Sequence, residues 1–157
     1  MGPLNQIYKK LDAGGAIYYA WATAMHTRID VVLCHRPQDE CQAAAEALVA
    51  ELGRLEARLN RFDPESDLTR INALAARQYI DLDPEMWGIL ASALNYGTKT
   101  DWFFDVTVQS TGRLAPPAGR VVMDMKKHAI TFSGKGVVID LGGFAKGYGL
   151  EKVQQQL

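Results

Sequence analysis

The sequence predicts an α+β fold in a single domain that spans residues 1–157. Segments rich in β-branched and aromatic residues occur along the chain beside segments whose apolar residues recur every three or four positions. The two kinds of segment do not alternate strictly, as they would in a parallel βαβ fold. A length of 157 residues is enough for one domain with a buried core.

The composition is that of an ordinary globular protein, with 48% hydrophobic and 22% charged residues. With 17 basic and 18 acidic side chains, the net charge of −1 gives no support for nucleic acid or an anionic membrane as a partner. No apolar run reaches the roughly 18–20 residues that a transmembrane helix needs. Asp12, Gly14 and Gly15 interrupt the chain after Lys9 and Lys10, so no signal peptide is visible. The sequence as it stands therefore predicts a cytoplasmic location.

Cys34 and Cys41 are the only cysteines. They lie on either side of a predicted strand-to-helix turn, so a disulfide is geometrically possible but is not implied. Two buried or half-buried thiols are the favoured interpretation. Together with His35 they are too few for a zinc site, and their spacing matches no standard zinc pattern.

The first predicted elements are two strands, over residues 15–23 and 27–34. In the second, Ile29, Val31 and Leu33 occupy alternate positions, which predicts a strand with one buried face. We expect the two strands to pair as neighbours.

A long amphipathic helix is predicted over residues 39–59, packed on a sheet. Its apolar stripe consists of Ala44, Leu48, Leu52, Leu55 and Leu59. Its charged residues are expected to form a solvated face: Glu46, Glu51, Arg54, Glu56 and Arg58.

A loop is predicted over residues 60–66, because Asp63-Pro64 disfavours helical backbone. Ser66 is expected to cap a short helix that runs to Leu74.

Residues 79–82 resemble a short strand. Asp83 is expected to cap the next helix, with Pro84 at its first position. We expect that helix to end at Gly97.

The remaining elements are shorter. An aromatic cluster over residues 101–108 leads into a turn or loop over 112–119, and residues 121–132 predict a β-hairpin. A buried strand is then expected over 137–139, followed by a helix from Ala145 onward.

The segment from Asp140 to Gly147 has the pattern of a strand, a glycine turn and a helix. Gly142 and Gly143 permit a tight turn and a close approach of the backbone to a ligand. The helix start offers unpaired N–H groups, and Lys146 adds a full positive charge, as a phosphate-binding site requires. Asp140 could bind a ligand hydroxyl or help to position a metal. A glycine turn made only for packing is the alternative.

A second candidate is the segment from Phe103 to Thr107. In extended chain, the Asp105 carboxylate and the Thr107 hydroxyl would face the same side. Phe103 and Phe104 could stack on a planar ring. The alternative is a strand that carries a core aromatic residue.

Two further segments contain Met25-His26-Thr27 and residues 62–66. Met25 would ordinarily fill a gap in the core, and His26 would ordinarily lie at the surface. Each of these segments is weak evidence by itself.

Taken in order, the four segments resemble motifs of the ApbE family of flavin transferases. The family pattern has a Met-Gly-Thr strand, an aromatic-x-Pro-x-Ser segment that leads to Asn, a Phe-Asp-Pro-Thr-Val segment, and Asp-Leu-Gly-Gly-Ile-Ala-Lys-Gly-Tyr. The corresponding segments here are Met25-His26-Thr27, Phe62 through Asn72, Phe104 through Val108, and Asp140 through Tyr148.

The resemblance implies an enzyme that uses FAD and a divalent metal, normally magnesium. Such an enzyme transfers FMN from FAD to a threonine or serine of an acceptor flavoprotein and releases AMP. The implied fold is a tunnelling-fold-like mixed or antiparallel sheet with helices packed on one side. The family typically works outside the cytoplasmic membrane, so a periplasmic or membrane-exterior location is the alternative to a cytoplasmic one.

The resemblance also implies roles for individual residues. The backbone carbonyl of Gly143 would be one metal ligand. The other implied contacts are with FAD: Met25 near the bound molecule, Phe62 stacked on one of its rings, Phe103, Phe104 and Asp105 lining the cleft, and Asp140 and Lys146 in direct contact.

Two substitutions depart from the family pattern: His26 replaces glycine and Val106 replaces proline. The resemblance covers only the N-terminal half or so of the family's usual length. The other half supplies the aspartate and threonine that complete the metal site, and one carbonyl is not a magnesium site. Two alternatives therefore stay open: a non-catalytic flavin- or nucleotide-binding module, and a half-chain that pairs with itself or with a complementary chain.

Overall fold

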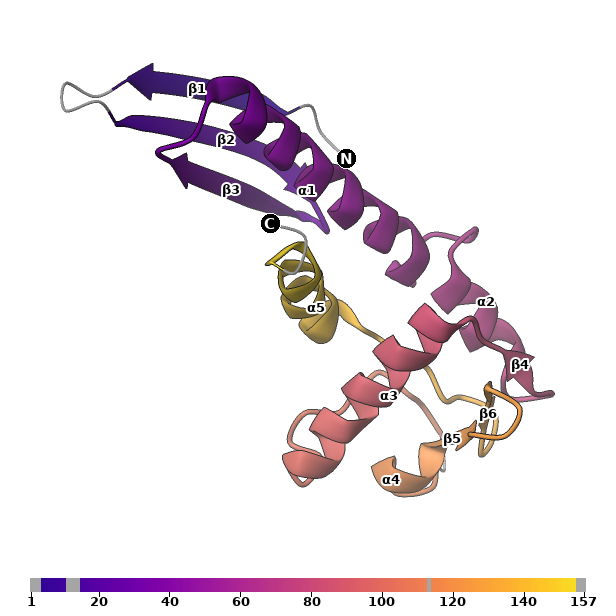
Figure 1. Cartoon of the computed structure of the whole chain (residues 1–157). Coiled ribbons are helices and arrows are strands. Elements are labelled where there is room, and N and C mark those ends of the chain that lie inside the picture. Colours follow the sequence, from indigo (N-terminus) through magenta and orange to yellow (C-terminus); the bar gives the residue numbers. More distant parts are fainter. Residues whose placement is uncertain (1–3, 11–14, 113, 155–157) are drawn as a thin grey trace. The chain divides into compact units, whose positions relative to one another are not determined.

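The computed structural model describes residues 4–10, 15–112 and 114–154. Helices and strands occur together in it, which confirms the predicted α+β class (Figure 1). The chain divides into two compact units, Met1–Ala57 with Gly149–Leu157, and Arg58–Tyr148. Among the described residues, no helix combines the length and the apolar character that a membrane span requires.

The first unit contains an antiparallel sheet of three strands in the order β1-β2-β3. The strands are β1 (Asn5–Lys10), β2 (Ala16–Ala24) and β3 (Thr27–Cys34). The predicted pairing of β2 with β3 is confirmed. Strand β1 was not predicted, because its short and largely polar sequence shows no clear alternation.

A two-residue turn, Met25-His26, joins β2 to β3. Both residues have positive φ, 51° and 56°, as in a type I′ turn. Glycine adopts this backbone most readily, which gives a physical reason for the glycine of the family pattern at position 26. Met25 is buried, with 8% of its surface exposed, as expected of a core methionine.

Helix α1 (Gln38–Leu59) confirms the predicted long helix. The leucines of the predicted stripe are buried, but Ala45 is the buried alanine and Ala44 is half-buried. Burial, together with the nearby Glu46 carboxylate and Cys41 thiol, raises the pKa of the Tyr18 hydroxyl on β2. This part of α1 therefore lies against the buried face of the sheet.

The two thiols differ in exposure. Cys41 is buried, as predicted, but Cys34 is exposed, so the prediction is wrong for Cys34. In β3 the buried Val31 lies at an odd-numbered position, whereas Cys34 shares the outward-facing register of the exposed Val32.

The second unit contains three whole helices, the last two residues of α1, the first part of a further helix, and a small sheet. Its strands pair antiparallel in the order β4-β6-β5. The predicted hairpin of β5 and β6 is confirmed. The elements after α1 are α2 (Asp67–Leu74), β4 (Ile80–Asp81), α3 (Pro84–Lys99), α4 (Pro117–Arg120), β5 (Val121–Asp124), β6 (Ala129–Phe132) and α5 (Gly142–Gln154), the last of which extends into the first unit.

Both predicted helix caps are confirmed. The Ser66 hydroxyl accepts a hydrogen bond from the Thr69 amide, and the Asp83 carboxylate accepts from the amides of Glu85 and Met86. Helix α3 continues two residues beyond the predicted end at Gly97, to Lys99. Glycine can occupy a helix interior where a neighbour packs closely, and Trp102 does so here.

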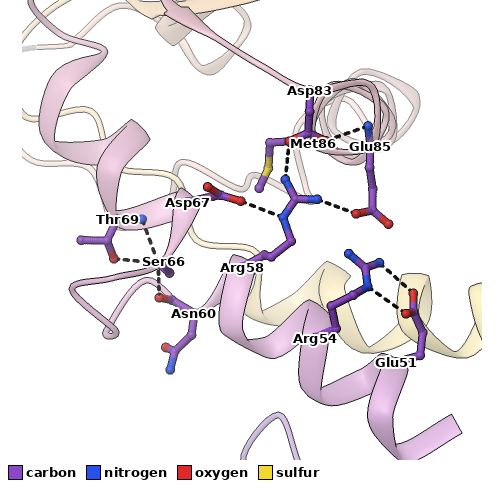
Figure 2. Close-up of polar contacts among 10 residues, drawn as sticks. All are labelled: Glu51, Arg54, Arg58, Asn60, Ser66, Asp67, Thr69, Asp83, Glu85 and Met86. Atoms are coloured by element: carbon purple, nitrogen blue, oxygen red, sulfur yellow. Dashed lines mark hydrogen bonds and ion pairs between the residues drawn. The ribbon is translucent and has the colours of Figure 1, made fainter. Parts of the chain in front are cut away.

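Arg58, in the last turn of α1, is not the solvated charge that the sequence predicted. Its side chain is only 20% exposed, and its Nε donates to Asp67 Oδ2 at 2.7 Å. Its other two nitrogens contact the carboxylates of Asp83 and Glu85 (Figure 2). This Arg58 network therefore joins the end of α1 to the starts of α2 and α3. The helical period identifies the face opposite the leucines, but not what packs on that face.

Candidate functional site

The predicted ligand-binding residues lie in both units. Met25 belongs to the first unit. The second unit contains the others: Phe62, Phe103, Phe104, Asp105, Asp140, Gly143 and Lys146. Several of these are brought together by three loops, over residues 60–66, 101–110 and 136–141.

Residues 137–139 do not form the strand that the sequence predicted. Side chains satisfy their backbone instead. The Asn72 amide donates to Ile139 O at 2.9 Å and accepts from Ile139 N at 2.8 Å. The Ser110 hydroxyl accepts from Val138 N at 2.9 Å. A run of β-branched residues fits a strand paired in a sheet, and it fits equally well an extended segment whose backbone is bonded by side chains. The sequence pattern alone therefore could not distinguish these two structures.

Helix α5 begins at Gly142, earlier than the predicted start at Ala145. The glycine pair therefore forms the first turn of the helix, not a turn before it. The Gly142 amide donates to Asp140 Oδ1 at 2.8 Å, so Asp140 caps the helix start. Both glycines lie close to site residues: a Cβ at Gly142 would lie 3.1 Å from Asp140 Oδ1, and one at Gly143 would lie 3.4 Å from the Phe104 ring.

Asp105 lies in a turn, so the extended backbone predicted for residues 105–107 is wrong. Its Oδ1 accepts from the Thr107 amide at 2.7 Å and from the Thr107 hydroxyl at 2.6 Å, the pattern of an Asx turn. Its Oδ2 accepts from Arg120 Nη1 at 3.0 Å, and the side chain is 12% exposed. The carboxylate of Asp105 is therefore bonded within the chain on both oxygens.

One backbone hydrogen bond joins the two motif segments. Asp140 N donates to Val106 O at 2.8 Å. On one side of this bond the Phe104 ring lies against Gly143, and on the other Arg120 binds Asp105. The structure therefore brings Phe104, Asp105, Asp140 and Gly143 into one cluster.

Arg61 connects Phe62 to this cluster. Its guanidinium lies over the Phe62 ring, 4.1 Å from the ring centroid. Its Nε donates to Asp140 Oδ2 at 2.8 Å. The Phe62 side chain itself is 74% exposed.

Phe103 and Lys146 lie at the surface. Phe103 is 97% exposed and follows two residues with positive φ, Asp101 and Trp102. Trp102 packs so closely on Gly97 that a Cβ there would lie 2.9 Å from its ring. Lys146 is exposed in the second turn of α5. Both side chains are therefore accessible to solvent.

The residues that the structure describes do not fit a complete magnesium site. None of them form a group of three or more His, Cys, Asp and Glu side chains that could hold a metal. Asp105 and Asp140 are each paired with an arginine. Magnesium needs an octahedral set of oxygen ligands, of which the Gly143 carbonyl would be one.

Sequence reasoning missed four residues that hold the site: Arg61, Asn72, Ser110 and Arg120. Arg61 and Asp140 are 79 residues apart, and Asn72 and Ile139 are 67 apart. No local pattern records such a pairing. For Asn72 a signal did exist, because it ends the second family motif. Its two hydrogen bonds to the backbone of Ile139, made by a half-buried side chain, could not be predicted from one sequence.

Comparison with known proteins gives consistent matches. The model of the ApbE family matches residues 25–157. The ApbE protein of Thermotoga maritima is 24% identical with a TM-score of 0.76, over 88% of this chain and 52% of that chain. The flavin transferase ApbE from Vibrio cholerae is 14% identical with a TM-score of 0.73, over 99% and 54%. The flavinyl transferase ApbE of Pseudomonas stutzeri is 16% identical with a TM-score of 0.61, over 99% and 52%.

The search of curated proteins found no match. The likeness to the three solved structures is one of fold, and it confirms the predicted α+β architecture. This chain spans about half the length of each of these structures.

Proposed function

This chain belongs to the ApbE family, and we propose that it forms the FAD-binding part of a flavin transferase. The proposed reaction moves FMN from FAD to a threonine or serine of an acceptor flavoprotein and releases AMP. The observation that carries this proposal is the family match over residues 25–157, which includes every segment predicted to bind FAD.

The contacts within the second unit support the proposal. The Phe104 ring packs against Gly143, so an aromatic face lies beside the start of α5. The amides of Gly142, Phe144 and Ala145 already have acceptors within the chain, so they are not the unpaired groups that the sequence predicted. The positive end of the dipole of this 13-residue helix remains at that start, and Lys146 adds a positive charge one turn later. A ligand with both a planar ring and a diphosphate matches this combination. We propose that Met25 and Phe103 complete the contacts with FAD.

The proposed transfer is a displacement at phosphorus. The acceptor hydroxyl oxygen forms a bond to the phosphorus of the FMN phosphate, and the bond from that phosphorus to the bridging oxygen breaks. AMP leaves with the bridging oxygen, and the hydroxyl proton passes to solvent. Lys146 and the positive end of the α5 dipole would stabilise the negative charge of the diphosphate during the displacement. The chain need supply no covalent nucleophile.

A non-catalytic flavin-binding module is the second candidate. It is favoured by the lack of a complete metal site among the residues that the structure describes. A chain that pairs with a second copy or with a complementary chain is a third candidate, since this chain spans about half the length of the related structures. We therefore derive no step through magnesium and propose only that the Gly143 carbonyl would be one of its ligands.

The test incubates the chain with FAD, magnesium and a peptide that carries the Asp-x-x-(Ser/Thr)-Gly-Ala-(Ser/Thr) acceptor pattern of flavinylated proteins. Mass spectrometry would detect the added FMN on the peptide, and loss of flavin fluorescence would report binding. Transfer supports the enzyme and excludes the binding module. Binding without transfer supports the module, and the absence of both overturns the proposal.

Replacing Lys146 with alanine should weaken FAD binding about tenfold at low salt, because a charged hydrogen bond to phosphate contributes roughly 1.5 kcal/mol or more. Titration of flavin fluorescence would measure the change. Lys135→Ala is the matched control, because Lys135 is also an exposed lysine of the second unit but is not in a motif segment. Equal affinity of the two variants would contradict the phosphate role.

A further inference from the structure

The Arg61 side chain contacts two of the predicted ligand residues. Its guanidinium lies over the Phe62 ring at 4.1 Å from the centroid, and its Nε donates to Asp140 Oδ2 at 2.8 Å. Neither the family pattern nor the sequence prediction assigned it a role. We propose that Arg61 is a positioning residue that fixes Phe62 and Asp140 relative to each other in the ligand site. This inference rests on the proposed function.

The loop that carries Arg61 is itself held in place. The Phe62 amide donates to Asn60 Oδ1 at 3.0 Å, and the Thr69 hydroxyl donates to Arg61 O at 3.0 Å. Ser66, drawn with Asn60 and Thr69 in Figure 2, donates its hydroxyl to Asn60 O at 2.7 Å. The backbone of Arg61 is therefore anchored at the end of α1 and the start of α2, and its side chain extends from a fixed point.

Asp140 has two oxygens with separate partners. Oδ1 caps α5 by accepting from Gly142 N, and Oδ2 accepts from Arg61. The carboxylate is thus held in one orientation at the helix start, where the Phe104 ring also packs against Gly143. Without Arg61, the Asp140 carboxylate would keep its hydrogen bond from the Gly142 amide, but its other oxygen would be free to change position. Both side chains of this pair are about a quarter exposed, 26% and 28%, so a ligand can reach them.

The position of the Phe62 ring depends on Arg61 more strongly than the position of the Asp140 carboxylate does. The Phe62 side chain is 74% exposed, and the Arg61 guanidinium covers one face of its ring. A planar guanidinium can stack on a ring while Nε, which lies in the same plane, binds a carboxylate. The ammonium of lysine carries the same charge, but it has no plane and no nitrogen at the position of Nε. Arg61→Lys therefore removes the geometry and keeps the charge.

The prediction is that Arg61→Lys weakens FAD binding at least about fivefold, because an unpositioned Phe62 must be ordered when the ligand binds. The salt dependence of binding should stay unchanged, since the charge is the same. Thermal unfolding should also change little, because a partly exposed pair contributes little stability. Fluorescence titration and calorimetry of the full chain measure these three quantities.

The control is Arg77→Lys, an exposed arginine of the same unit outside the loops of the site. A second variant, Phe62→Leu, completes a double-mutant cycle with Arg61→Lys. If Arg61 acts through Phe62, the lysine substitution should have a much smaller effect on FAD affinity in the Phe62→Leu background than in the wild type.

The outcomes separate this inference from the proposed function. If the wild type binds no flavin, both are overturned. If the wild type binds FAD and Arg61→Lys behaves as Arg77→Lys does, only the positioning role is overturned. Additive effects in the cycle, or a loss of affinity that merely follows a loss of thermal stability, would also overturn it.

Discussion

Replacing Arg58 with methionine should lower the free energy of unfolding by about 2–3 kcal/mol, because it leaves three carboxylates close together without their shared cation. Methionine retains most of the apolar stem, so the change isolates the guanidinium. The expected loss lies below that of a fully buried pair, since Asp67 and Asp83 are 36% and 49% exposed. Denaturant unfolding followed by far-ultraviolet circular dichroism would measure it.

Arg54→Met is the matched control, one turn earlier on α1 (Figure 2). Arg54 pairs with Glu51 on the same helix and is 43% exposed, so its removal should change the free energy of unfolding by at most about 1 kcal/mol. If Arg58→Met and Arg54→Met lower the free energy of unfolding by similar amounts, the Arg58 network contributes no more to stability than an ordinary surface ion pair.

The Arg58 network also predicts a pH dependence of stability. Burial would raise the pKa of the Asp83 carboxyl, but the hydrogen bonds from Arg58 and from the Met86 amide outweigh it and hold the pKa below its usual value. A carboxyl with a lowered folded-state pKa contributes stability above its unfolded pKa of about 3.9 and loses it as the pH falls through the folded-state pKa. The difference between wild type and Arg58→Met should therefore shrink below about pH 4.

The elements with a regular period were predictable from the sequence. Leucines at three- and four-residue steps predicted α1, because a helix must bury one stripe. Ser66 and Asp83 were recognisable as caps, since their side chains act on amides two or three residues away. The segment over 137–139 was not predictable, because its partners Asn72 and Ser110 lie far away in the sequence.

The candidate site was predictable only in part, for a related reason. Its motifs are short linear segments, so Phe104, Asp105, Asp140 and Gly143 could be found one segment at a time, and the structure gathers them. The arginines that bind Asp140 and Asp105 could not be found from short linear motifs. Charge counting places Arg61 and Arg120 at the surface by default, whereas each is a part-buried partner of an aspartate.

Gly136 supports the second large expected effect. It has a φ of +90°, and a Cβ built on it would lie 2.2 Å from the Thr111 carbonyl oxygen. That carbonyl cannot move freely, because the Thr111 amide donates to Gly136 O at 2.9 Å and fixes the two backbones together. Gly136→Ala should therefore lower the free energy of unfolding by about 3 kcal/mol or more, through both the clash and the strained φ.

Gly134→Ala is the control for this substitution, two residues earlier in the same loop. A Cβ at Gly134 meets no atom within 4 Å, and its φ lies outside the left-handed region, so the expected change is within about 0.5 kcal/mol. Because Gly136 begins the segment that leads to Asp140, a Gly136→Ala protein that still folds should also bind FAD more weakly than Gly134→Ala. Equal free energies of unfolding for the two variants would contradict this prediction. They would mean that the loop at Gly136 can move away from Thr111 at little cost, so that the backbone hydrogen bond between them does not fix the segment that leads to Asp140.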